Sequence, residues 1–117
     1  VSLFPPLQET LEDLADNPNI FWGHHREAEI SGVIELNMEQ EHVEICRLVV
    51  APKAFRRGVG STLVRAAIDL GQPVRVMTAQ ANAPAIRLYE RLGFRIVTVD
   101  EKRAPGLPLV ELRVPGP

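Results

Sequence analysis

Two glycines, Gly58 and Gly60, lie where the sequence passes from an apolar strand into a helical pattern. Glycine has no side chain, so the backbone N–H groups there stay uncovered, and the first turn of a helix leaves several N–H groups without an intrahelical partner. The helix dipole adds roughly half a positive charge at that end. The segment therefore predicts a cradle for a phosphate or pyrophosphate, with Arg56 and Arg57 adding charge at its rim.

The loop alone does not identify this ligand. A P-loop carries a lysine directly after its last glycine, and no lysine stands at that position here. The dinucleotide fingerprint needs a third glycine, where this chain has Leu63. Both nucleotide interpretations fail, and a tight loop without a ligand explains the segment equally well.

A second candidate segment, residues 82–94, holds the chain's only tyrosine, Tyr89. Asn82 is a favourable N-cap residue, Pro84 is tolerated in a first helical turn, and Gly93 can adopt the left-handed conformation that ends helices. These signals predict a helix of about ten residues between two strands. Tyr89 can simply pack there with its hydroxyl at the surface, or it can serve as a proton donor.

Cys46 is the only cysteine, which excludes an intrachain disulfide and is compatible with a cytoplasmic location. It lies in the apolar run EICRLVVAP, where a buried packing role is favoured over a nucleophilic one. Arg47 should point to the other face of that strand. No metal site is expected, because none of the histidines has a metal-ligand spacing: His24, His25 and His42.

Hydrophobic periodicity and turn residues predict the elements that hold these residues. Strand–helix–strand connections favour parallel pairs, whereas strands that follow one another directly should form hairpins. We therefore predict an α+β domain, residues 1–117, with one mixed sheet flanked by helices. The expected helices are 7–17, 61–70 and 82–92, and the expected strands are 19–29, 31–40 (with a bulge near Gly32), 42–51, 73–80, 94–100 and 109–114.

The composition fits a single core-forming domain, with 45% hydrophobic and 24% charged residues among 117. The formal net charge of −2 gives no electrostatic reason to expect a nucleic-acid partner. No apolar run approaches the roughly 20 residues that span a bilayer, and the first residues lack a signal-peptide pattern, so neither a membrane partner nor secretion is expected.

Together, the two segments resemble the motifs of the GNAT superfamily of acyl-CoA-dependent N-acyltransferases. The family's pyrophosphate loop reads Arg/Gln-x-x-Gly-x-Gly/Ala after a proline; Phe55 departs from it at the Arg/Gln position. The resemblance runs from about residue 31 to the end, and the N-terminal strand and helix region of the family is abbreviated here. The matching residues are Pro52, Gly58 and Gly60 in the loop, and Asn82, Ala85, Leu88, Tyr89, Gly93 and Phe94 in the motif Asn-x-x-Ala-x-x-Leu-Tyr-x-x-x-Gly-Phe.

The resemblance implies direct transfer of an acetyl group from acetyl-CoA, the cosubstrate, to a primary amine of a small molecule or protein. It assigns Tyr89 to protonation of the departing thiolate and Asn82 to a hydrogen bond with the donor. It further implies that pantetheine pairs with the backbone at Leu48, Val49 and Val50, and that the pyrophosphate is held by Arg56, Arg57, Gly58, Val59, Gly60 and Ser61.

The acceptor amine must lose a proton, and the sequence offers several bases. Glu44 is favoured, because strand alternation should place it on the same face as Leu48 and Val50. Some GNAT enzymes also carry a glutamate at the corresponding place. A solvated strand-end glutamate is an equal alternative, and Glu35 and Glu41 are further candidates.

Two other functions stay open. Phe55 and the short N-terminal region are compatible with a GNAT-fold module that binds CoA or a partner protein without catalysis. The Phe21-Trp22 pair would suit an interaction domain that binds no CoA, although core packing explains the pair as well. The acceptor is not identified, and the resemblance allows a homodimer.

Overall fold

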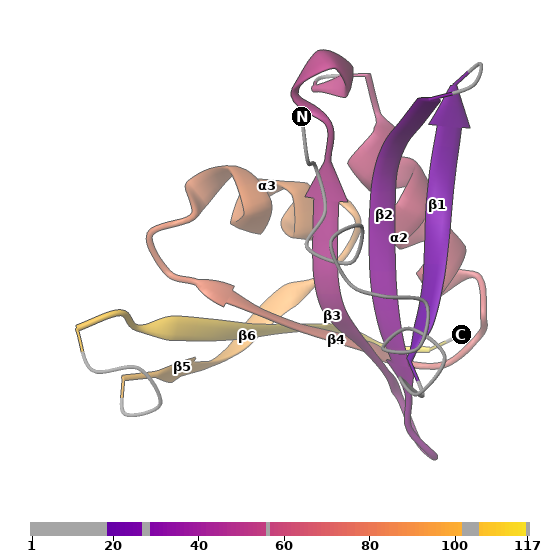
Figure 1. The fold of residues 1–117 in the computed structure, drawn as a ribbon. Coiled ribbons are helices and arrows are strands. Elements are labelled where there is room, and N and C mark those ends of the chain that lie inside the picture. The colour runs from indigo at the N-terminus through magenta and orange to yellow at the C-terminus, as the bar shows by residue number, and fades with distance from the viewer. Residues whose placement is uncertain (1–18, 27–28, 56, 102–105, 117) are drawn as a thin grey trace.

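The computed structural model describes residues 19–26, 29–55, 57–101 and 106–116 (Figure 1). The expected helix at 7–17 and the residue Arg56 lie outside these ranges. The other expected helices and strands are confirmed, with boundaries shifted by a few residues. The elements are β1 (Ile20–Arg26), β2 (Glu29–Met38), β3 (Val43–Val50), the short 3-10 helix η2 (Pro52–Ala54), α2 (Val59–Ile68), β4 (Val74–Ala79), α3 (Ala83–Arg91), β5 (Arg95–Asp100) and β6 (Leu109–Val114).

The described strands form one six-stranded sheet in the order β1-β2-β3-β4-β6-β5. Only β3 and β4 pair in parallel, and the other neighbours are antiparallel, so the predicted mixed sheet and α+β class are confirmed. The crossover through α2 gives the expected parallel pair. The crossover through α3 does not make β4 and β5 neighbours, because β6 lies between them. The twist turns β1–β3 nearly crosswise to the β4–β6–β5 arm (Figure 1).

A bulge at Cys46 decides which way the β3 side chains point. Glu35 on β2 pairs with Arg47, and Leu36 pairs with Ile45, so Cys46 has no partner in the β2–β3 register. The extra residue shifts the alternation, and Ile45 and Leu48 both pack on the core although they are three residues apart.

The expectation that Glu44 shares a face with Leu48 and Val50 is therefore wrong. Glu44 lies between the buried residues Val43 and Ile45 and points to the opposite face of the sheet. A similar irregularity skips Ser31 in the β1–β2 register, next to Gly32, where a bulge was expected.

The core fills the space between the sheet and the helices α2 and α3. Helix α2 buries the stripe Val59, Leu63, Val64 and Ala67, as its spacing predicts. Gly32 on β2 is needed for this contact, because a Cβ on it would lie 2.7 Å from Val59 Cγ1. The largest fully buried side chains are Phe94, Ile34, Leu36, Leu112, Val43, Val64, Val74 and Val110.

Two further searches cover the described residues only. None of their helices is long and apolar enough to cross a membrane. No group of three or more His, Cys, Asp or Glu side chains in these ranges is arranged to hold a metal ion.

Candidate active site

An opening in the sheet between β3 and β4 forms the candidate site. The two strands pair only at Val43–Val74, Glu44–Arg75 and Ile45–Val76, and beyond these pairs they part. A pocket of about 150 Å³ lies there, which is room for the reacting end of a long donor rather than for a whole ligand. Its lining comes from β3 (Ile45, Cys46, Arg47 and Leu48), β4 (Val76, Met77 and Thr78) and the α3 region (Asn82, Ala85 and Tyr89).

Tyr89 reaches this pocket from an otherwise buried position. The residue is only 4% exposed, and its ring packs against Phe94 with the ring centres 5.2 Å apart and the planes at 57°. Loss of solvent raises the pKa of the Tyr89 hydroxyl to about 12. The hydroxyl therefore keeps its proton at every pH at which the chain would work.

The two ends of helix α3 fix the position of Tyr89. The Asn82 Oδ1 atom accepts a hydrogen bond of 3.3 Å from the Ala85 N–H, as the predicted N-cap requires. At the other end Gly93 has a φ of 100°, and the Phe94 N–H donates to the Tyr89 carbonyl at 3.0 Å. Since Oδ1 holds the helix, the side-chain NH₂ of Asn82 is the group that can donate towards the pocket.

The N-terminus of α2 has the open geometry expected of an anion cradle. Gly58 is its N-cap with a φ of 77°, a left-handed conformation that favours glycine, and the first turn contains no acidic residue. A Cβ on Gly58 would meet no atom within 4 Å. Val59 is buried, so it can offer a ligand only its backbone N–H, whereas Ser61 is partly exposed and Arg57 is exposed.

Gly60 brings the cradle, the end of β3 and helix α3 together. A Cβ on Gly60 would lie 3.3 Å from Leu88 Cδ2, 3.7 Å from Val50 Cγ2 and 3.8 Å from Leu48 Cδ2. Gly60 of the predicted pyrophosphate loop thus lies beside Leu48 and Val50, and beside Leu88 on the helix that carries Tyr89. Close packing, rather than backbone freedom, explains the second glycine of the loop.

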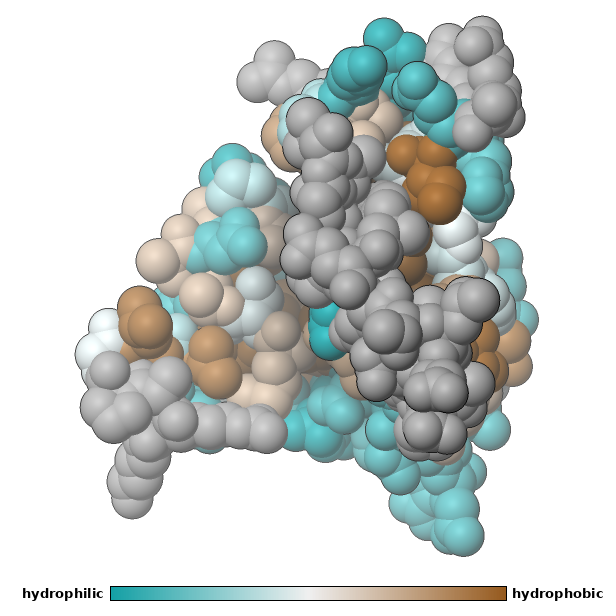
Figure 2. All heavy atoms as spheres, in the orientation of Figure 1, coloured by the Kyte–Doolittle hydropathy of each residue, from teal (hydrophilic) through white to brown (hydrophobic). Residues whose placement is uncertain are grey.

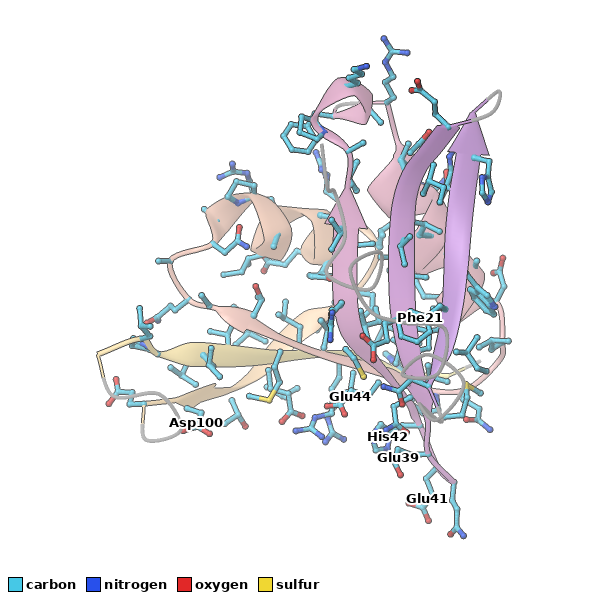
Figure 3. The ribbon with its side chains drawn as sticks, in the orientation of Figure 1. Phe21, Glu39, Glu41, His42, Glu44 and Asp100 are labelled. Atoms are coloured by element: carbon cyan, nitrogen blue, oxygen red, sulfur yellow. The ribbon has the colours of Figure 1, made fainter. Side chains whose placement is uncertain are left out.

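Charged side chains occupy the opposite face of the sheet beside the opening. Arg75 on β4 lies between two carboxylates, with 3.4 Å from Nη1 to Glu44 Oε1 and 3.4 Å from Nε to Glu111 Oε1. Arg113 continues the series through an ion pair with Glu111. Figure 3 shows Glu44 low on β3, where β4 crosses beside it, well above the exposed Glu41 in the β2–β3 turn. Glu44 lies next to the opening, whereas Glu41 lies farther from it.

A second charged group involves the other predicted alternative base. Glu35 on β2 is buried, and its Oε1 atom lies 3.0 Å from Arg47 Nε while its Oε2 accepts a 2.6 Å hydrogen bond from Asn19. Arg47 also lines the pocket. Glu35 thus holds the guanidinium of Arg47 beside the opening.

Cys46 corrects one expectation from the sequence. The thiol is exposed rather than packed in the core, and both Cys46 and Arg47 line the pocket instead of pointing to opposite faces. Partial burial, followed by the nearby charges of Glu35 and Glu44, raises the pKa of the Cys46 thiol.

Met77 and Thr78 also line the pocket, and no motif pointed to them. The one sequence feature that could have marked them as site residues is their position at the end of a strand that leads into the predicted helix. Loops and strand ends at such positions commonly contribute site residues.

Sequence comparisons relate the chain to known proteins. Residues 2–94 match the model of the Acetyltransferase (GNAT) family. The chain is 36% identical over 94 residues to UPF0157 protein YqkA of Bacillus subtilis, covering 78% of this chain and 27% of YqkA. It is 36% identical over 64 residues to the peptidyl-lysine N-acetyltransferase YiaC of Escherichia coli, covering 52% of this chain and 44% of YiaC.

The fold is shared with solved members of that family. A GNAT family acetyltransferase from Elizabethkingia anophelis, solved with acetyl-CoA bound, superposes with a TM-score of 0.76 at 20% identity, covering 90% of this chain and 81% of that protein. The present chain spans less than half the length of either curated relative.

The raised pKa of Tyr89 can be measured directly, because the chain has a single tyrosine. Phenolate absorbance of the folded protein should titrate with a midpoint of about 12, and that of the denatured chain near the ordinary value of about 10. The fold binds this proton more tightly than the unfolded chain does. Titration of Tyr89 therefore does not change the free energy of unfolding below pH about 10, and it lowers this free energy as the pH rises through about 12. A midpoint near 10, with circular dichroism still native, would contradict the buried hydroxyl.

Proposed function

This chain belongs to the GNAT acetyltransferase family, and we propose that it transfers an acetyl group from acetyl-CoA to a primary amine. The observation that carries the proposal is the buried Tyr89 that lines the opening between β3 and β4. The acetyl-CoA bound to the related protein from Elizabethkingia anophelis supports the choice of donor. YiaC, which is named for acetylation of peptidyl lysine, supports an amine as acceptor.

The donor would lie along the helix side of the opening. The N–H groups of residues 58–61 suit a pyrophosphate, and the exposed Arg57 would add positive charge beside them. Arg56 is proposed for the same role from the sequence alone, because it lies outside the described residues. The backbone at Leu48, Val49 and Val50 would pair with the pantetheine arm in the manner of a strand, since β4 no longer occupies that edge of β3. The Asn82 NH₂ group would donate to the same arm.

Tyr89 would assist the departure of the thiol. Breaking the C–S bond leaves charge on sulfur, and a free thiol titrates near pH 8.5, so thiolate release at neutral pH is slightly unfavourable. A hydroxyl whose pKa is about 12 stays protonated and donates to the sulfur as this charge develops. The products are CoA thiol and an N-acetyl amide.

The acceptor amine would approach from the charged face of the sheet. A lysine-type amine with a pKa of about 10.4 is almost fully protonated at pH 7, and freeing it costs about 5 kcal/mol. We propose Glu44 as the base that takes this proton, directly or through one water, because it lies beside the last β3–β4 pair on that face. Arg75 holds the carboxylate in place across 3.4 Å.

Transfer is proposed to be direct rather than through an acetyl-enzyme. Cys46 lines the pocket, but its raised pKa leaves little thiolate at neutral pH. Cys46→Ser should keep most of the activity, and an accumulating acetyl-cysteine would contradict direct transfer.

A single domain at residues 1–117, a cytoplasmic location and a homodimer complete the proposal. No metal, nucleic-acid or membrane partner is part of the proposal. A non-catalytic CoA-binding module is the alternative. Its main support is Phe55, which is 60% exposed and occupies the family's Arg/Gln position.

The cradle can be tested with two matched glycines. Gly58 and Gly71 flank the two ends of α2 with φ values of 77° and 88°, and a Cβ on either would meet no atom within 4 Å. Gly58→Ala and Gly71→Ala should therefore cost a similar stability, about 1 kcal/mol each. Only Gly58→Ala should weaken CoA binding, by roughly tenfold in calorimetry. Equal CoA affinities in the two variants would remove the cradle from the donor site.

Tyr89→Phe tests the proposed acid. Phenylalanine keeps the contact with Phe94 and removes only the hydroxyl, so the fold should persist. Turnover of acetyl-CoA should fall about 10²-fold or more, with little change in CoA affinity. Unchanged turnover with the same amine would exclude this role for Tyr89.

Glu44→Gln tests the proposed base, with Glu41→Gln as the control on the exposed β2–β3 turn. Turnover at pH 7 should fall about 10²-fold in Glu44→Gln only. The loss of turnover should become smaller as the pH approaches the pKa of the free amine, because the acceptor is then already neutral when it binds. A deficit that is constant with pH, or absent, would assign deprotonation elsewhere.

A further inference from the structure

Arg47 is the one charged side chain among the described residues that line the pocket. The other lining side chains are apolar or neutral polar groups, so the lining itself carries a positive charge and no negative charge. A guanidinium attracts anions and repels a protonated amine. Its place in a pocket proposed for an amine acceptor therefore indicates that the acceptor has a second, anionic group.

The guanidinium of Arg47 lies on the face of the sheet opposite α2. Its Nε atom is 3.0 Å from Oε1 of Glu35, and Glu35 alternates with core residues on β2, so it points away from the core. Glu44 pairs with Asn37, two residues from Glu35 on β2, and shares that face. Figure 2 views this face, since α2 lies behind β2 in the same orientation, and shows hydrophilic residues below the crossing of β3 and β4.

Glu35 fixes one edge of this guanidinium and leaves the other edge open. The Glu35 side chain is only 5% exposed, and its second carboxylate oxygen accepts the hydrogen bond from Asn19. A buried carboxylate needs such partners, so Glu35 is a fixed support rather than a flexible surface charge. The Arg47 side chain is 40% exposed, and no second carboxylate among the described residues lies within ion-pair distance of it. With Nε turned to Glu35, the Nη1 and Nη2 groups can donate to a ligand.

The positions of Arg47 and Glu44 suit the two ends of one small molecule. The bulge at Cys46 places them opposite alternate residues of β2, so their Cα atoms are spaced as in a regular strand, at roughly 7 Å. The two Nη groups of a planar guanidinium match the two oxygens of a carboxylate. A molecule with its amine at Glu44 and its carboxylate at Arg47 would thus be held at both ends.

We propose that Arg47 binds a carboxylate of the acceptor, and that the acceptor is a free amino acid whose primary amine and carboxylate are a few atoms apart. This inference rests on the proposed function, because it takes the pocket as the place where donor and acceptor meet. The amine nitrogen bonds to the acetyl carbon, its proton passes to Glu44, and the C–S bond breaks as Tyr89 donates to sulfur. The carboxylate takes no part in these steps, so Arg47 acts on KM rather than on kcat.

Matched acceptors test the charge without any change to the protein. The compounds γ-aminobutyrate and δ-aminovalerate are each compared with their amides, in which the amine pKa is nearly unchanged because the acid group is several bonds from nitrogen. Glycine and β-alanine, with their amides, test shorter spacings. For at least one pair, the wild-type KM should be about 30-fold lower for the acid than for the amide, at similar kcat.

Substitution of Arg47 tests the residue. Arg47→Gln should raise the KM of the preferred acid about 30-fold and leave the KM of its amide unchanged. Arg47→Lys keeps the charge without the planar fork and should lose only part of the preference. Arg95→Gln is the matched control, because it removes a positive charge from the exposed surface of β5, outside the pocket, and should change neither KM. The melting temperature shows whether each variant folds, since Arg47→Gln leaves Glu35 buried without its cation.

Binding is measured beside turnover, by calorimetry with CoA present, so that the two proposals fail separately. The absence of an acetylated product from every amine would contradict the proposed transfer. Binding of the acid but not of its amide, lost in Arg47→Gln, would still support the carboxylate site. Equal affinities for acid and amide in every pair, or a preference for the acid that survives in Arg47→Gln, would overturn the inference even where transfer is observed.

Discussion

The early end of the β3–β4 pairing is the constraint on which the rest of the site depends. The two strands share only the pairs from Val43–Val74 to Ile45–Val76, and then they separate. Backbone groups that would otherwise bond across a parallel ladder become available to a ligand at that point. The Cys46 bulge lies one residue past the last pair, so the strand changes its twist and its facing residues where the opening begins.

The two faces of the sheet beside the opening differ in their chemistry. On the helix side, close packing of Gly60 against Leu88 joins the helix cradle to the helix that carries Tyr89. On the other side, Arg75 links β3, β4 and β6 through Glu44 and Glu111. A donor and an acceptor that must meet at one carbonyl carbon could thus be recognised by different surfaces, with the pocket between them.

Local sequence signals predicted much of this architecture. The cap residue Asn82, the helix-ending Gly93 and the left-handed Gly58 each act within a few residues, and each behaves as its chemistry requires. The positions of Tyr89 and of the glycine loop followed from these short-range rules. The order of the strands could not be predicted in this way, because the position of β6 between β4 and β5 depends on contacts between residues far apart in the sequence.

Bulges caused the main errors about side-chain direction. Period-two alternation put Glu44 with Leu48 and buried Cys46, but one extra residue in β3 reversed both expectations. The residues next to Cys46 do not predict such a bulge, since neither glycine nor proline is present there. The acceptor is beyond sequence reasoning for a related reason: its recognition depends on surfaces assembled from several strands.

Release of thiol from acetyl-CoA, measured across a panel of amines that includes lysine peptides, peptide N-termini, polyamines and aminoglycosides, tests the central claim most directly. The account predicts CoA release above the rate of hydrolysis with at least one class of amine, together with an N-acetylated product in the mass spectrum. CoA binding by calorimetry without accelerated release for any amine would contradict it and would favour a non-catalytic CoA-binding module.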